Sequence, residues 1–92
     1  MENRRTRARE LIQVALSEVE AERRTPHYQL KPADLDTCIE TLRGYLAALE
    51  HGVLPPRRDR PEGLGRLVAD SWPFDVPLAN AVLQAERAWR NA

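Results

Sequence analysis

The chain has 92 residues, with 14 basic and 14 acidic side chains that give no formal net charge at pH 7. This length fits one domain with a small core, and the neutral balance excludes a general electrostatic attraction to nucleic acid or anionic membranes. Cys38 is the single cysteine, so an internal disulfide is excluded, and no apolar run is long enough for a signal peptide or a membrane span; we therefore expect a cytoplasmic protein.

The first predicted helix covers about residues 3–24. Its end is set by Thr25 and Pro26, because the residue before a proline is pushed out of the α region. Arginines in the first turn oppose the helix dipole, so we expect residues 1–7 to fray. The apolar side chains fall on one face at helical spacing; they are Ala8, Leu11, Ile12, Ala15, Leu16 and Val19.

The second predicted helix covers about residues 32–51 and has the most regular apolar stripe of the chain. The connector before it is short, which favours an antiparallel hairpin with the first helix. Pro32 suits the first turn, and Gly52 suits the left-handed conformation that ends many helices. The stripe consists of Leu35, Cys38, Ile39, Leu42, Tyr45, Leu46 and Leu49.

Two further helices are predicted after a proline-rich break. The third is short, about residues 60–71, and Asp59 with Glu62 resembles a capping pair at its start. The fourth covers about residues 76–91, with Asp75 as the expected N-cap. Their expected core side chains are Leu64, Leu67, Val68, Trp72, Leu78, Ala81, Val82, Ala85 and Trp89.

These elements predict an all-α protein with a single helical domain over residues 1–92. We expect a small irregular four-helix bundle, in which the first two helices form an antiparallel hairpin. The short third helix and the fourth helix are expected to close over that hairpin.

No residue pattern in the sequence indicates catalysis. His27 and His51 lie at opposite ends of the second helix, about 30 Å apart, so they cannot share a metal within one chain. Cys38 lies inside an apolar stripe, which favours an inert core thiol. We therefore predict a protein that is not an enzyme and has no catalytic, cofactor or metal site. A small ligand near His27 and Tyr28 is left open.

Two surfaces are candidate interfaces. The back of the second helix carries a row of small residues, which either allows another helix to approach closely or simply faces water; the row is Thr37, Thr41, Gly44 and Ala48. The second candidate is the corner formed by Trp72 and Phe74, which either anchors a partner or plugs the end of the bundle. Val14 and Leu83 lie off their stripes and are expected to be exposed.

The absence of a catalytic pattern favours a non-catalytic protein–protein interaction or regulatory module. Its partner is expected to be another protein or a second copy of the chain, and a net charge near zero removes one barrier to self-association. The alternative is a protein that binds nucleic-acid phosphates through two arginine clusters, although no aromatic residue is interleaved for base stacking. The clusters are Arg4, Arg5 and Arg7, and Arg57, Arg58 and Arg60.

Overall fold

The computed structural model describes residues 3–60, 63–73 and 75–92. This part of the chain contains four α-helices, so the predicted all-α class and helix order are confirmed. A short 3₁₀ turn, η1, precedes the third helix. The elements are α1 (Arg4–Arg24), α2 (Pro32–His51), η1 (Arg57–Asp59), α3 (Gly63–Ser71) and α4 (Pro77–Asn91).

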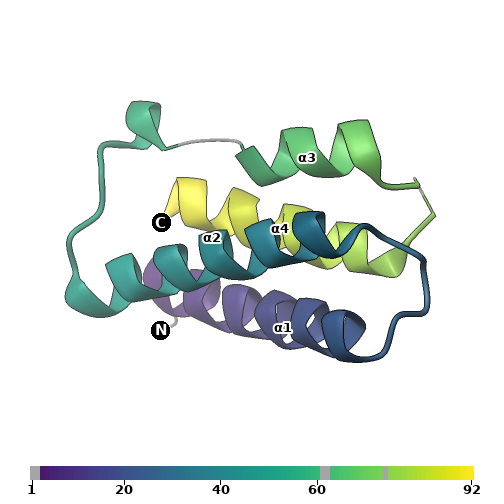
Figure 1. Ribbon diagram of the computed structural model, residues 1–92. Coiled ribbons are helices and arrows are strands. Elements are labelled where there is room, and N and C mark those ends of the chain that lie inside the picture. The colour runs from purple at the N-terminus through teal and green to yellow at the C-terminus, as the bar shows by residue number, and fades with distance from the viewer. Residues whose placement is uncertain (1–2, 61–62, 74) are drawn as a thin grey trace.

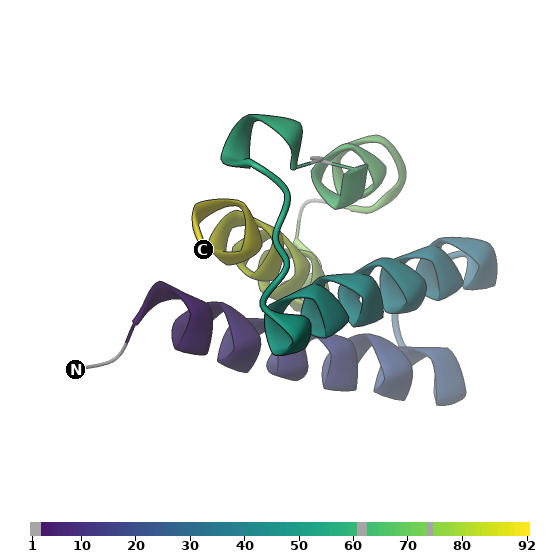
Figure 2. The same cartoon turned by 90° about the vertical axis from the view of Figure 1, so that its left-hand side faces the viewer.

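The helix α1 packs against both α2 and α4, which makes it the base of the bundle. α1 and α2 run antiparallel, as predicted, and α4 runs in the same direction as α2 (Figure 1). The short α3 lies on the side of the bundle opposite α1, where it rests mainly on α4 and also contacts α2 (Figure 2). The start of α1 and the end of α4 lie at one end of the bundle, and the α1–α2 loop lies at the other.

The predicted apolar stripes form one continuous core. Side chains from all four helices are fully buried in it; the largest are Ile12, Val19, Leu35, Cys38, Leu42, Leu64 and Val82. Both α1 and α4 bury alanines, and small side chains allow two helix backbones to approach closely. The buried alanines are Ala8, Ala15, Ala79 and Ala85.

Helix ends confirm some of the predicted signals and correct others. Gly52 ends α2 in the left-handed conformation, with φ of 73°, as predicted. The side chain of Asn3 accepts a hydrogen bond from the Thr6 amide at 2.8 Å, and this cap satisfies a donor in the arginine-rich first turn of α1. The prediction of Asp75 as the N-cap of α4 is wrong: Val76 occupies that position, without a side-chain cap, because the helix begins one residue later, at Pro77.

The start of α3 is capped from another helix. Of the predicted capping pair, Glu62 lies outside the described residues. Glu86 of α4, which is 4% exposed, accepts hydrogen bonds from the backbone amides of Leu64 and Gly65, both at 2.9 Å. Its Oε2 also accepts a hydrogen bond from the Tyr45 hydroxyl of α2 at 2.7 Å. One buried carboxylate therefore joins α2, α3 and α4.

The approach of Glu86 to α3 is made easier by a glycine. A Cβ at Gly65 would lie 3.3 Å from Oε1 of Glu86, closer than most such contacts. Tyr45 also stacks on Trp89, with ring centroids 4.7 Å apart and an interplanar angle of 11°. The carboxylate thus lies beside an aromatic pair that fills the space between α2 and α4.

A buried arginine caps the C-terminus of α4, as Glu86 caps the N-terminus of α3. Arg60, which is 8% exposed, donates from Nη1 to the carbonyls of Trp89 and Arg90, at 2.9 and 3.1 Å. Its Nε donates to the carbonyl of Pro55, and the guanidinium lies 5.5 Å from the centroid of the Trp89 ring. A cation at the C-terminus of a helix is favoured by the helix dipole.

We predict that Glu86→Gln lowers the free energy of unfolding by about 2–3 kcal/mol, because the amide nitrogen faces backbone donors and leaves at least one of them unsatisfied. Urea denaturation followed by circular dichroism measures the change. Glu50→Gln, at an exposed position of α2, is the control and should leave stability unchanged. A Glu86→Gln midpoint equal to that of the wild type would contradict the role given to this carboxylate.

Candidate functional site

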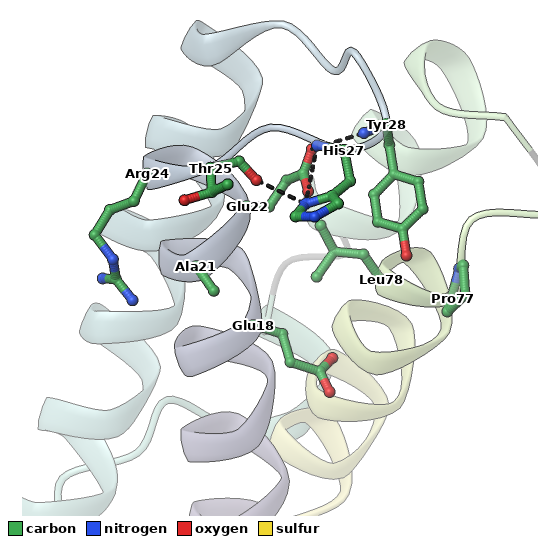
Figure 3. Close-up of a pocket in the computed structure, with 9 residues that line it drawn as sticks. All are labelled: Glu18, Ala21, Glu22, Arg24, Thr25, His27, Tyr28, Pro77 and Leu78. Carbon is green, nitrogen blue, oxygen red and sulfur yellow. Dashed lines mark hydrogen bonds and ion pairs between the residues drawn. The ribbon is translucent and has the colours of Figure 1, made fainter.

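A hollow of about 570 Å³ opens where the end of α1, the α1–α2 loop and the start of α4 meet (Figure 3). It lies in the region that the sequence analysis left open for a ligand. The residues that line the hollow are Glu18, Ala21, Glu22, Arg24, Thr25, His27, Tyr28, Pro77 and Leu78.

The loop at this hollow is held by a second buried carboxylate. Glu22, 5% exposed, accepts hydrogen bonds from the backbone amide of His27 at 2.9 and 3.1 Å and from that of Tyr28 at 3.0 Å. These donors offset the cost of removing the carboxylate from water. The imidazole of His27 is positioned by a 2.8 Å contact between its Nδ1 and the carbonyl oxygen of Thr25.

The backbone held by Glu22 presents two ring side chains at the surface. The His27 side chain is largely exposed, and Tyr28 is 41% exposed, with the two ring centroids 6.4 Å apart. The next residue, Gln29, adopts a left-handed conformation with φ of 58°, which is uncommon for a residue other than glycine. The loop therefore has a defined conformation although most of its side chains face solvent.

The walls of the hollow differ in polarity. Figure 3 shows the Glu18 carboxylate reaching from α1 toward α4, while Pro77 and Leu78 form the apolar side below Tyr28. Arg24 points away on the other side of α1. Glu18 forms no hydrogen bond or ion pair within the described part of the chain. These groups can attract and orient a ligand, and the carboxylate of Glu18 is free to bind one.

The other ionisable groups in the core have structural roles. Burial raises the pKa of the Cys38 thiol to about 12, and the charges of Asp34 and Glu86 act in the same direction. Burial and the hydrogen bond to Glu86 likewise raise the pKa of Tyr45. Among the residues that the structure describes, no three His, Cys, Asp or Glu side chains are grouped to hold a metal, and no helix is long and apolar enough to span a membrane.

The small-residue row on α2 is not covered by another helix of the chain. Thr37 and Gly44 are exposed, and Thr41 and Ala48 are half-buried. A Cβ built on Gly44 meets no atom within 4 Å. Ala48 packs against the edge of the core, so only Thr37 and Gly44 of the row are left open, and an intermolecular contact of the row stays a prediction.

Of the two residues of the predicted aromatic corner, the structure describes only Trp72. Trp72 is buried, with 5% exposure, so this side chain plugs the bundle and is not displayed at the surface. Phe74 lies outside the described residues. Val14 and Leu83 are exposed, as predicted.

The arginine clusters are only partly displayed. Arg4, Arg5, Arg7 and Arg58 are exposed, and the side chain of Arg57 is not described. Arg60 is a correction: its guanidinium is buried against carbonyl groups at the end of α4 and cannot reach a phosphate. The alternative of nucleic-acid binding is left with the exposed arginines and stays a prediction.

Comparison with known proteins adds no assignment: no family model matches this sequence, and no curated protein matches it significantly.

Sequence reasoning missed Glu22, Arg60 and Glu86. A signal for the two acids was present, since Glu22 follows Val19 by three residues and Glu86 follows Val82 by four, so both continue an apolar stripe. A charged residue at a stripe position indicates a buried polar contact. Arg60 had no comparable signal, because it follows a loop.

We predict that Cys38 resists alkylation in the folded protein, because its raised pKa leaves almost no reactive thiolate. The stability that the buried thiol contributes is present below its ordinary pKa of 9.0 and is lost as pH rises toward 12. Mass spectrometry after iodoacetamide treatment at mildly alkaline pH measures this, with protein unfolded in urea as the control. Equal labelling of both samples would contradict the burial of this thiol.

We predict that Glu22→Gln loosens the α1–α2 loop, because the neutral amide accepts through one oxygen only and its nitrogen opposes the His27 amide, at a cost of about 1–3 kcal/mol. Hydrogen exchange measured by NMR should show faster exchange at the His27 and Tyr28 amides. Glu10→Gln, at an exposed site on the same helix, is the matched control. Unchanged protection of both amides in Glu22→Gln would show that Glu22 does not hold the loop.

Proposed function

We propose that this protein is a non-catalytic interaction module, and that the outer face of α2 contacts a helix of a protein partner or of a second copy of the chain. The observation that carries the proposal is Gly44. It lies in the middle of a 20-residue helix, where glycine costs about 1 kcal/mol relative to alanine, and no atom of the described residues lies within 4 Å of the position that its Cβ would take.

The neighbours of Gly44 support a helix-binding face. Arg43 donates to Glu20 of α1 at 2.9 Å, and Asp36 accepts from Arg23 of α1 at 2.9 Å. These ion pairs direct Arg43 and Asp36, the sequence neighbours of Gly44 and Thr37, toward α1, while Glu40 is the exposed charged residue on the side of the helix that carries the row. The row itself then offers threonine, glycine and alanine over much of a helix about 30 Å long, a surface that a second helix can approach closely.

The buried charged side chains of Glu22, Arg60 and Glu86 have structural partners, which also supports a binding role over a catalytic one. Glu22 and Glu86 satisfy backbone amides, Arg60 satisfies backbone carbonyls, and Cys38 is enclosed in the core. These side chains therefore hold helix ends and loops in place. What the fold presents outward is a stable helical surface.

We predict that Gly44→Leu removes binding through α2 without unfolding the protein, because the added side chain meets open space within the chain. Size-exclusion chromatography with light scattering measures self-association, and a tagged pull-down with mass spectrometry measures binding to other proteins. The variant should be monomeric where the wild type is dimeric, or should no longer capture the protein that the wild type captures.

Two variants control this test. Gly44→Ala should raise stability by up to about 1 kcal/mol, which checks that the position is open in the folded chain. Gln13→Leu adds the same bulk at an exposed position of α1 and should bind like the wild type. A wild-type protein that stays monomeric, with the same proteins captured by wild type and Gly44→Leu, would refute the proposal.

A further inference from the structure

We propose that the hollow between the end of α1, the α1–α2 loop and the start of α4 binds an alkylammonium group, with the ammonium at Glu18 and the alkyl chain against Pro77 and Leu78. This site is separate from the face of α2 proposed above. Its volume of about 570 Å³ lies in the range typical of small-ligand sites.

The charge of the ligand follows from the carboxylates. Glu18 is exposed and has no partner among the residues described, and its carboxylate extends across the hollow toward α4 (Figure 3). Glu22 adds a second negative charge at the wall; within the described residues its hydrogen bonds come from neutral backbone amides, and the His27 Nδ1 lies 3.7 Å from its Oε1. The nearest cationic side chain in the lining, that of Arg24, is directed away. An incoming cation therefore finds the Glu18 carboxylate without a cationic partner among the described residues, while Glu22 faces a cation only when His27 is protonated.

The shape of the ligand follows from the other lining side chains. The Tyr28 ring lies above Leu78 and Pro77, so an alkyl chain can lie along apolar surface on that side (Figure 3). Because the carboxylate and the ring stand on different sides of the hollow, a primary ammonium on a short alkyl chain fits both.

The site is also preformed. Glu22 fixes the backbone of His27 and Tyr28 through hydrogen bonds of 2.9–3.1 Å, and the left-handed Gln29 follows directly. A ligand that binds against Tyr28 therefore pays little for ordering the loop. The alkylammonium group has two sources, a free small amine or the lysine side chain of a peptide.

NMR titration of the isotope-labelled full chain tests the proposal. The probes are n-butylammonium, n-butanol, butyrate and a blocked tripeptide with lysine at its centre. We expect n-butylammonium to shift the amide signals of His27, Tyr28 and Leu78, and the neutral and anionic analogues to leave them unchanged. Equal shifts with the tripeptide identify a lysine side chain as the natural ligand, and shifts with n-butylammonium alone identify a free amine.

Variants assign the contacts. Glu18→Gln should weaken n-butylammonium binding about fivefold, as expected for an ion pair at a protein surface, and Tyr28→Ala about threefold, as expected for the lost apolar contact between the ring and the alkyl chain. Glu10→Gln, on α1 but outside the hollow, should bind like the wild type. So should Gly44→Leu, which separates this proposal from the one for α2.

Three results would overturn the proposal: no shift with n-butylammonium, equal shifts with n-butanol, or unchanged affinity in Glu18→Gln. The amide spectrum of each variant shows directly whether it is folded, so a loss of binding cannot be confused with a loss of structure.

Discussion

The carboxylate of Glu86 is the contact on which the arrangement of this protein most depends. It is buried on α4, it satisfies the first amides of α3, and it accepts the hydroxyl of Tyr45 on α2. A buried charge is tolerated only when donors surround it, so the carboxylate fixes the position of three helices relative to one another. Gly65 eases the close approach, since a Cβ at this position would have to displace the carboxylate by a few tenths of an ångström.

Buried charged side chains also satisfy backbone groups at two other points of the chain. Glu22 satisfies the amides of the loop after α1, and Arg60 satisfies the carbonyls at the end of α4. In each case, backbone amides or carbonyls that lack a partner within their own helix or loop form hydrogen bonds with a buried charged side chain. A chain of 92 residues has a small core, so these charge-assisted hydrogen bonds give the short elements a defined place.

Most of the fold was predictable from the sequence because apolar periodicity and proline and glycine signals are local. The bounds of α2, the left-handed Gly52 and the buried stripe from Leu35 to Leu49 follow from residues a few positions apart. The stripe positions of Glu22 and Glu86 signalled burial, but the partners of Glu86 and Arg60 were not predictable, because they lie 22 or 29 residues away, as for Glu86 with Leu64 and Arg60 with Trp89. The hollow was anticipated only as a position near His27 and Tyr28; its free carboxylate, Glu18, became visible when the fold placed it opposite α4.

The origin of the cap on α3 has a consequence for the order in which the chain acquires structure. A helix of nine residues is too short to be stable alone, and the acceptor for its first amides is 21 and 22 residues further along the chain. During synthesis, the α1–α2 hairpin is complete while α3 still lacks that acceptor. The cap on α3 can therefore form only once α4 has been synthesised, so the third helix depends on a residue that is made after it.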